Sequence, residues 1–280
     1  MIRICVPATS ANLGPGFDAV GIALRLYNQV WMEESESLEI SSRDGTRVPQ
    51  DASNLIFKSA KCLYEKCGRE LTGLRIAQLN PIPMARGLGS SSACIVAGIC
   101  GANRLLGSPL DRQKLIDLAA ELEGHPDNIA PCFLGGLTAS AIDGGRVYSA
   151  SVPVTEKLRF VLFIPPFELK TARARAVLPQ YYSRSDAVYN ISRVALTVAS
   201  LCSGNLENLR VAVQDKIHQP YRAGLIPHCG EVFELSRRLG SLGTYISGAG
   251  PTVVSIAASE QAEMFAARAE QELADKGIGG

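Results

Sequence analysis

The chain has 280 residues, which is enough for one large domain or two modest ones, each with a substantial hydrophobic core. Hydrophobic residues make up 46% of it, and 28 Lys and Arg residues balance 27 Asp and Glu residues. This composition excludes disorder and disfavours nucleic-acid binding through overall basicity. The longest apolar stretches, such as residues 160–166, are far shorter than the roughly 18 to 20 residues that cross a bilayer, so we expect no membrane insertion.

The N-terminus and the cysteines indicate a compartment. The first residues alternate in polarity instead of forming a basic segment followed by an apolar one, so we expect no export signal and a cytoplasmic protein. The eight cysteines are scattered without a C-x-x-C pair, and we expect reduced thiols, several of which lie in apolar runs and pack as small hydrophobes. The three histidines lack zinc-ligand spacing, which disfavours a zinc site.

Strands and helices are interleaved along the first half of the chain. Alternating residues predict a strand over 2–6, and shorter strands are expected over 38–40 and 74–79. Residues 91–106 are small and apolar almost all round, which is typical of a buried helix, and Gly107 is expected to follow its end. The next helix is predicted to have Ser108 as its N-cap and Gly124 as its stop.

In the second half, the turn at Gly144 predicts a hairpin, and residues 158–164 are expected to form a buried strand that opens a second subdomain. A last strand is predicted over 252–257, followed by a helix over 260–276 with Ser259 as its N-cap. This mixture of hairpins and crossovers favours an α+β fold over a regular doubly wound sheet. We place the domain boundary between residues 152 and 153.

A glycine-rich loop over residues 81–93 (PIPMARGLGSSSA) lies between a predicted strand and the buried helix. Gly87 and Gly89 carry no Cβ, so the backbone can adopt positive φ and approach an anion, with N–H groups and a helix N-terminus pointing at it. One hydroxyl of the three serines that follow could ligate Mg²⁺. The loop has no G-x-x-x-x-G-K-[ST] pattern, so it is not of the Walker type. Taken alone, it is equally well interpreted as a glycine turn capped by serines.

Two further segments have the same character, residues 7–18 (PATSANLGPGFD) and residues 247–252 (SGAGPT). With the loop, they resemble the three motifs of the GHMP kinases, and residues 247–252 are expected to buttress the loop. Residues 7–18, 123–128, 171–179 and 220–222 are similar to the homoserine kinases of that family, and the resemblance runs from residue 2 to 257. It implies an N-terminal domain over 1–152 with a left-handed βαβ unit, and a ferredoxin-like C-terminal domain over 153–280.

The resemblance implies phosphorylation of the L-homoserine hydroxyl by ATP and Mg²⁺, a step of threonine biosynthesis. It makes Glu123 a metal ligand together with a loop serine, for which we take Ser91, while Glu121 should point elsewhere on the helix. A carboxylate in the last helical turn is disfavoured by the macrodipole, and a bound cation would reverse that penalty. The residues expected to contact ATP are Asn54, Pro81, Ile82, Pro83, Met84, Ala85, Arg86, Gly87, Leu88, Gly89, Ser90 and Ser91.

The substrate implied by the resemblance is a small zwitterion. Arg175 and Arg222 are expected to hold its carboxylate through charge-assisted hydrogen bonds. Either Asp18 or Asp127 would hold the ammonium group. The hydrogen bonds are completed, as in family members, by the side chains of Asn12 and His125.

Two mechanisms remain open for the reacting hydroxyl. Asn128 is expected to orient it, because an amide cannot accept its proton. In the first mechanism, catalysis is mostly positioning and charge stabilisation, and the proton passes late to the phosphoryl group. In the second, Asp127 is the general base, as an aspartate in this neighbourhood is in mevalonate kinases. Thr171 stands four residues before Arg175, as in the resembled family, and is placed near the γ-phosphate; alone it would be an ordinary threonine at a strand end.

The sequence departs from the family at one point and leaves rivals. A single residue, Gly124, separates Glu123 from His125, where some members insert several. One rival is a kinase fold that serves as a ligand sensor, which the intact loop and Glu123 argue against. The other is a kinase or decarboxylase of mevalonate-type acids. The two arginines and several acids argue against this rival, because together they favour an amino acid as the substrate. We expect no nucleic-acid or membrane partner, and a homodimer is left open.

Overall fold

The computed structural model describes residues 1–279. The chain divides into two compact units, and each is made of segments that are separate in the sequence. The first unit comprises Met1–Thr9, Ile22–Met84 and Gly89–Ser151. The second comprises Ser10–Gly21, Ala85–Leu88 and Val152–Gly280. Most of the 7–18 motif and the middle of the glycine-rich loop therefore group with the C-terminal half of the chain.

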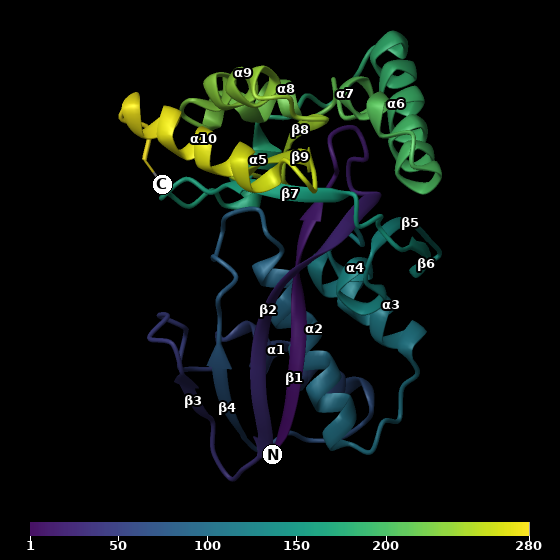
Figure 1. Cartoon of the computed structure of the whole chain (residues 1–280). Helices are drawn as coiled ribbons and strands as arrows, with labels where there is room; N and C mark the ends of the chain where they lie inside the picture. The colour runs from purple at the N-terminus through teal and green to yellow at the C-terminus, as the bar shows by residue number, and fades with distance from the viewer. Residues whose placement is uncertain (280) are drawn as a thin grey trace. The chain divides into compact units, whose positions relative to one another are not determined.

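The first unit is built on a six-stranded sheet with the order β3-β4-β2-β5-β6, in which β1 pairs with β2 (Figure 1). Strand β2 runs antiparallel to β4, with Gln29 opposite Leu79 and Glu34 opposite Leu74, whereas β3 and β4 are parallel. Helix α1 connects these parallel strands, so they form a βαβ unit whose left hand stays a prediction. The strands are β1 (Ile2–Ala11), β2 (Val20–Glu34), β3 (Glu39–Ser42), β4 (Leu74–Leu79), β5 (Leu137–Asp143) and β6 (Arg146–Val152).

Helix α2 is the buried helix that the sequence predicted. Gly98 and Gly101 let it pack closely, because a Cβ on Gly98 would lie 2.3 Å from the Ile56 carbonyl oxygen and one on Gly101 2.8 Å from the Met32 sulfur. Helix α1 and strand β2 therefore approach α2 directly, and the core of the unit lies among them. The helices are α1 (Leu55–Lys66), α2 (Ser90–Leu105), α3 (Arg112–Glu123) and α4 (Ile129–Leu134).

The predicted start of α3 is wrong and its predicted end is confirmed. Asp111, not Ser108, is the N-cap, and its carboxylate accepts a hydrogen bond from the Lys114 backbone N–H at 2.9 Å. Ser108 has a φ of +65°, and the Asn103 side chain bonds both backbone groups of Leu110 at 3.0 Å, which keeps this segment out of the helix. The helix stops at Gly124 as expected. The hairpin at residue 144 is also confirmed, between β5 and β6.

The second unit contains a three-stranded antiparallel sheet with the order β7-β9-β8. Helices α9 and α10 pack on it, and Figure 1 shows them on one side of the strands. Its strands are β7 (Leu158–Phe163), β8 (Gly243–Ile246) and β9 (Val253–Ala258). Its helices are α5 (Thr171–Ala176), α6 (Arg184–Ser203), α7 (Leu209–Ala212), α8 (Gln219–Arg222), α9 (Cys229–Arg238) and α10 (Ala262–Asp275), with short 3₁₀ turns at Leu206–Asn208 and Ala223–Leu225.

Two details of the second unit differ from the sequence prediction. The strand at 158–163 exists, but Leu158 is its one fully buried residue, and most of the strand is half-buried. Ser259 does not cap the last helix, which begins at Ala262. Its hydroxyl donates instead to the Glu156 carbonyl, which ties it to the turn before β7. The fifteen-residue strand β2 and helix α6 have no counterpart among the predicted elements.

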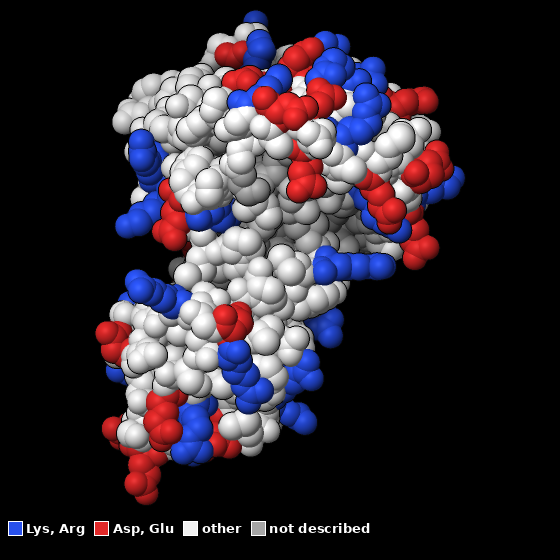
Figure 2. All heavy atoms as spheres, turned by 60° about the vertical axis from the view of Figure 1, so that its left-hand side comes forward, with Lys and Arg blue, Asp and Glu red and all other residues white. Residues whose placement is uncertain are grey.

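The surface charges and the free thiols follow the sequence prediction, although Cys5 and Cys202 are exposed. Acidic and basic side chains are interspersed on the face drawn in Figure 2. Within residues 1–279, no helix combines the length and the apolar character that a membrane crossing requires. All eight cysteines are free in the described chain, and burial raises the pKa of Cys94 and Cys100 to about 12, which keeps both thiols protonated at neutral pH.

Candidate active site

The glycine-rich loop enters helix α2 through Gly89, whose φ of +68° is left-handed, and Gly87 has a φ of +76°. The predicted positive φ values are therefore confirmed. A Cβ on Gly89 would lie 1.9 Å from the Thr9 hydroxyl oxygen and 3.2 Å from Asn128 Oδ1. Glycine is thus required twice at this position, by the backbone conformation and by the two polar side chains that lie against it.

Residues 247–252 buttress the middle of the loop, as expected. The Ser247 hydroxyl donates to the Gly87 carbonyl at 2.6 Å, and the Thr252 backbone N–H donates to the Arg86 carbonyl at 3.3 Å. Arg86 itself donates from Nε to the Pro165 carbonyl at 3.0 Å and lies 4.0 Å from the Glu168 carboxylate. Its guanidinium group is therefore engaged with protein groups in this structure, and its expected contact with ATP stays a prediction.

Two serines at the start of α2 converge on Glu123 at the end of α3. The Ser91 hydroxyl donates to Glu123 Oε2 at 3.1 Å and the Ser92 hydroxyl to Oε1 at 2.7 Å. Glu121 points away, as expected, and pairs with Lys66 on the surface at 3.3 Å. Hydroxyl and carboxylate oxygens are the donors that Mg²⁺ prefers, so this group fits the metal that the sequence predicted and adds Ser92 as a neighbour.

A chain of hydrogen bonds fixes Asn128 beside Gly89. The Thr9 hydroxyl donates to Asn128 Oδ1 at 2.7 Å, and Asn128 Nδ2 donates to Asp127 Oδ1 at 3.3 Å. His125 Nδ1 lies 2.6 Å from the same carboxylate oxygen and must donate its proton, since the carboxylate accepts. Asp127 and Asn128 are both buried. Sequence reasoning missed Thr9, although it lies within the 7–18 motif.

In the second unit, Arg175 and Asp18 form a bidentate ion pair with distances of 2.9 and 2.7 Å. These residues are expected to bind opposite ends of the substrate, and here they bind each other. Their side chains are 37% and 33% exposed, and ion pairs with that exposure contribute little to stability. The pair can therefore exchange partners at small cost.

Arg222 is held differently, because its side chain is buried. Its Nε donates to the Ala174 carbonyl at 3.2 Å and its Nη1 to the Gly248 carbonyl at 2.8 Å. The guanidinium groups of Arg175 and Arg222 lie 5.4 and 5.2 Å from the centroid of the Phe17 ring, within the range of cation–π attraction. Phe17 is a second residue that sequence reasoning missed, and its position directly before Asp18 was the available signal.

Asn12 lies in the same part of the second unit, buried and with a φ of +72°. Its Nδ2 donates to the Gly248 carbonyl at 3.0 Å, while its Oδ1 accepts from the Asp18 backbone N–H at 3.1 Å. The structure therefore brings four of the six residues predicted to bind the substrate into this unit, namely Asn12, Asp18, Arg175 and Arg222. The other two, His125 and Asp127, belong to the first unit.

Thr171 and Asn54, which are both predicted to lie near ATP, stand at the starts of two helices. Thr171 is exposed and begins helix α5 instead of ending a strand, so Arg175 follows one turn later on the same face. Asn54 is the N-cap of α1: its Oδ1 accepts from the Ile56 N–H at 3.0 Å, and its Nδ2 donates to the Pro49 carbonyl at 2.9 Å. The cap explains this residue structurally, and its expected contact with adenine stays a prediction.

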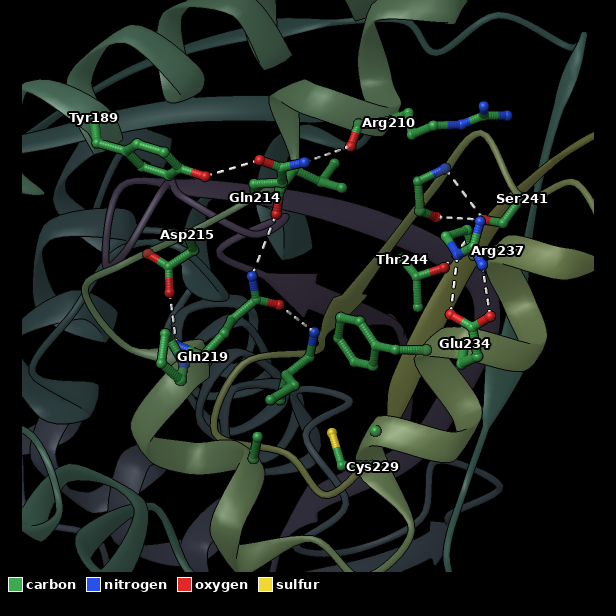
Figure 3. A pocket seen from close by; sticks show the side chains of 17 residues that line it. Tyr189, Arg210, Gln214, Asp215, Gln219, Cys229, Glu234, Arg237, Ser241 and Thr244 are labelled. Carbon is green, nitrogen blue, oxygen red and sulfur yellow. Dashed lines mark hydrogen bonds and ion pairs between the residues drawn. The ribbon is translucent and has the colours of Figure 1, made fainter.

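The second unit also contains a cavity of about 590 Å³ between helices α6 to α9 and strand β8 (Figure 3). The Glu234–Arg237 ion pair, with a distance of 2.6 Å, lies along it. The Gln219 side chain reaches across from α8, donating to the Val213 carbonyl and accepting from the Ile246 N–H. The residues that line this cavity include none of those predicted for the site.

Comparison with known proteins identifies the family. The chain matches the models of the GHMP kinases N terminal domain over residues 54–136 and of the GHMP kinases C terminal region over residues 197–275. It is 44% identical to the homoserine kinase of Clostridium beijerinckii, covering 99% of this chain and 93% of that one. It is 45% identical to the homoserine kinase of Caldicellulosiruptor saccharolyticus, covering 91% of this chain and 84% of that one.

Among solved structures, the homoserine kinase of Cytophaga hutchinsonii superposes with a TM-score of 0.87 at 31% identity, covering 98% of this chain and 90% of that one. The expected two-domain α+β fold is thus confirmed. The chain belongs to the GHMP kinase family, and within it to the homoserine kinases.

Proposed function

We propose that this chain transfers the γ-phosphoryl group of ATP to the side-chain hydroxyl of L-homoserine, giving ADP and O-phospho-L-homoserine for threonine biosynthesis. The observation that carries this proposal is the identity of 44% to a homoserine kinase over 99% of the chain. The grouping of two guanidinium groups and a carboxylate around Phe17 supports an amino-acid acceptor, because these charges complement a zwitterion.

The phosphates of ATP are assigned to the glycine-rich loop, with Asn54 towards the base. The backbone N–H groups at the start of α2 favour an anion. Ser91 and Glu123 would hold Mg²⁺, with Ser92 beside them, since their oxygens already converge. When bound, the ion would neutralise charge on the phosphates that react. Thr171, at the start of α5, is assigned to the γ-phosphate.

The six residues predicted to bind homoserine keep that assignment in the proposal. In the second unit, Arg175 and Arg222 would bind the carboxylate, and Asp18, released from Arg175, would bind the ammonium group together with Asn12. In the first unit, His125 and Asp127 would complete the hydrogen bonds. Because the Asp18–Arg175 pair is one third exposed, a substrate that brings both charges can replace each partner in turn.

In the chemical step, Asn128 orients the homoserine hydroxyl. Its oxygen forms a bond to the γ-phosphorus while the bond from that phosphorus to the β–γ bridging oxygen breaks, and ADP leaves. The hydroxyl proton passes to an oxygen of the transferred phosphoryl group, because a loose transition state asks little of a base. Asp127 Oδ1 already accepts hydrogen bonds from His125 and Asn128, which favours a positioning role for that carboxylate.

A second mechanism, with Asp127 as the general base, is favoured by one observation. Asp127 is a buried carboxylate in direct contact with Asn128, the residue assigned to the reacting hydroxyl. A proton taken by its second oxygen would leave the hydrogen bond from His125 intact. The two mechanisms differ in the predicted kinetics of an Asp127→Asn variant.

The proposed function is tested by Mg²⁺-dependent ADP release from ATP with a panel of acceptors. The panel is L-homoserine, D-homoserine, L-serine, L-threonine, mevalonate, galactose and buffer alone. We expect L-homoserine to exceed every other acceptor by far. Faster turnover of mevalonate or galactose would retain a kinase and contradict the amino-acid roles. ATP binding without turnover of any acceptor would contradict the enzyme itself and favour a sensor.

A further inference from the structure

His218 lies at the centre of the contacts around Arg222, although sequence reasoning assigned it no role. Its side chain is 0% exposed. Its Nε2 lies 2.6 Å from the Gly14 carbonyl oxygen, and its Nδ1 lies 3.2 Å from Arg222 Nη1. Its ring lies against Phe17, with the two ring centroids 5.4 Å apart. Both nitrogens of one imidazole therefore have partners, Gly14 in the 7–18 motif and Arg222 on α8. We call Asn12, Asp18, Arg175 and Arg222 the amino-acid site.

The partners of His218 determine its tautomer. A guanidinium group can only donate, so Nδ1 must be unprotonated to accept from Arg222. A carbonyl oxygen can only accept, so Nε2 must carry the proton that is donated to Gly14. The imidazole is therefore neutral, and a second proton would place a cation 3.2 Å from Arg222 and remove its acceptor.

The surrounding groups hold the ring in this state. Burial lowers the pKa of His218 below its ordinary value, and the charge of Arg222 adds to the effect. The carboxylates of Asp215 and Asp18 and the hydrogen bond to Gly14 oppose it, but burial is the largest contribution. Arg175 completes the charged groups nearby, because its guanidinium lies against the Phe17 ring that packs on His218.

The backbone that carries His218 is fixed by Asp215, whose carboxylate also lies 3.7 Å from His218 Nε2. The Asp215 carboxylate accepts hydrogen bonds from the backbone N–H groups of Ile217, His218 and Gln219 at 2.9, 2.8 and 2.6 Å. Figure 3 shows Asp215 directed at the start of α8, beside Gln219. Asn190 bridges Asp215 at 2.7 Å and the Pro15 carbonyl at 3.2 Å, so α8 and the 7–18 motif share this support.

Gly14 is pressed against the same support. A Cβ at this position would lie 2.1 Å from the Val213 carbonyl oxygen, so only glycine lets the backbone approach Val213 this closely. The segment that leads to Phe17 is therefore held by Val213, Asn190 and His218. Of these three residues, His218 is the one whose side chain also contacts Arg222.

We propose that His218, as a neutral imidazole, is a positioning residue for the amino-acid site. It holds the Arg222 guanidinium group and the Gly14 carbonyl in one arrangement and thereby orients Arg222 towards the substrate carboxylate. Arg222 Nη1 is fixed by His218 on one side and by the Gly248 carbonyl on the other, which sets the rotation of the whole planar group. This inference rests on the proposed function, since it requires Arg222 to bind homoserine.

The test compares three substitutions of His218. His218→Leu fills similar space without hydrogen bonds, His218→Asn can keep an acceptor near the Nδ1 position, and His218→Gln can keep a donor near the Nε2 position. We expect His218→Leu to raise the KM for L-homoserine about tenfold, as for a lost hydrogen bond to a charged group, and to leave the KM for ATP unchanged. His218→Asn should recover more of this loss than His218→Gln. His228→Asn, at an exposed histidine, is the matched control.

A lower melting temperature with an unchanged KM for L-homoserine would show that the ring merely fills space, and would overturn the proposal. Better recovery by Gln than by Asn would overturn the assignment to Arg222. A pH profile adds a readout that packing alone does not move: the KM of the wild-type protein should rise at low pH as His218 is protonated, and that of His218→Asn should not share this rise.

Two further measurements keep the inference separate from the proposed function. If Arg222→Lys leaves the KM for L-homoserine unchanged, then the role of Arg222 in the proposed function fails. If that variant raises KM while the His218 variants do not, then the further inference alone fails. Should the variants not fold, ¹⁵N NMR of the wild-type ring decides: we expect Nδ1 to be unprotonated at pH 7, and a proton on Nδ1 would overturn the proposal.

Discussion

The two units hold their charged groups in opposite ways. In the first unit, the carboxylates of Glu123 and Asp127 accept hydrogen bonds from hydroxyl, amide and imidazole groups, so this acidic site already has hydrogen-bond partners without an arginine or lysine. In the second unit, the guanidinium groups of Arg175 and Arg222 flank Phe17, and this cationic site includes an ion pair that can open. The first arrangement suits a metal ion and phosphoryl transfer, and the second suits a carboxylate that arrives with the substrate.

The charged side chains also differ in exposure, and this difference is found within the second unit. Asp127 and Arg222 are each 2% exposed, whereas Asp18 and Arg175 are about a third exposed. A buried, hydrogen-bonded charge keeps one geometry, while an exposed pair exchanges partners easily. The substitution at Glu123 is therefore expected to change the chemical step and the one at Arg175 the binding of homoserine, and a variant of either residue that changed both would weaken the comparison.

The largest effect is expected for Glu123→Gln. The amide keeps the shape and loses the charge that a metal ion requires, so kcat should fall at least about a hundredfold, the equivalent of a few kcal/mol of transition-state stabilisation. The Mg²⁺ concentration for half-maximal activity should rise. Glu121→Gln is the control, because that carboxylate lies on the same helix and pairs with Lys66 at the surface. Equal loss in the two variants would contradict the metal assignment.

Next in size is Arg175→Ala. Loss of one charge-assisted bond to the substrate carboxylate, about 1.5 to 3 kcal/mol, should raise the KM for L-homoserine roughly 10- to 150-fold. The KM for ATP should stay within twofold of the wild-type value. Arg173→Ala, an exposed arginine on the same short helix, should behave as wild type. A parallel rise in the KM for ATP would contradict the assignment of Arg175 to the substrate carboxylate.

Asp127→Asn separates the two mechanisms. If Asp127 positions the substrate, the KM for L-homoserine should rise about tenfold with at most about a tenfold loss of kcat, as for a lost charged hydrogen bond. If it is the general base, kcat should fall by about 10² to 10⁴ with little change in KM. Steady-state kinetics at saturating ATP distinguish these results. The account expects the first, and a collapse of kcat alone would replace it with the second.

Gly89→Ala should mainly cost stability. The left-handed backbone costs about 1 to 2 kcal/mol with a Cβ, and the overlap with the Thr9 hydroxyl adds to it. Gly204→Ala is matched in φ, at +80° against +68°, but its Cβ would meet nothing within 4 Å. Thermal unfolding should therefore show a larger fall in melting temperature for Gly89→Ala. Equal falls would mean that Thr9 does not press on the loop.

The smallest effect concerns the stability of the protein as a function of pH. The pKa of His218 is lowered in the folded chain. Below its ordinary pKa of 6.5, the unfolded chain therefore binds a proton at His218 that the folded chain does not bind. The free energy of unfolding should therefore fall as pH drops below 6.5, by at most about 1.4 kcal/mol per pH unit from this residue. Urea titrations should show a shallower fall for His218→Gln and an unchanged one for His228→Gln.

The sequence predicted those structural features that depend on residues close together in the chain. The glycine-rich loop and the buried helix after it follow from short motifs and their spacing, whereas Glu123 was assigned through the resemblance to the GHMP kinases. The bond from Thr9 to Asn128 spans 119 positions and that from His218 to Gly14 spans 204, so no local pattern could reveal them. The role of His218 as a buried neutral histidine can be inferred only when the partners of both its ring nitrogens are known.

The errors at helix starts have the same origin. Ser108 and Asp111 are both good N-cap residues, and they lie three positions apart. The Asn103 side chain selects between them, because it binds Leu110 on both backbone groups and keeps the helix from starting earlier. Propensity was therefore ambiguous, and a contact from the preceding helix decided the outcome.

The most direct test of the central claim uses a substrate that lacks one charge. The compound 3-aminopropan-1-ol is homoserine without its carboxylate, so it keeps the ammonium group and the hydroxyl but cannot engage the two arginines. For the wild-type protein we predict at least a tenfold lower kcat/KM with this compound than with L-homoserine, as the loss of charge-assisted bonds requires, and a much smaller difference for Arg175→Ala. Equal turnover of the two compounds by the wild-type protein would contradict the assignment of the cationic site to the substrate carboxylate.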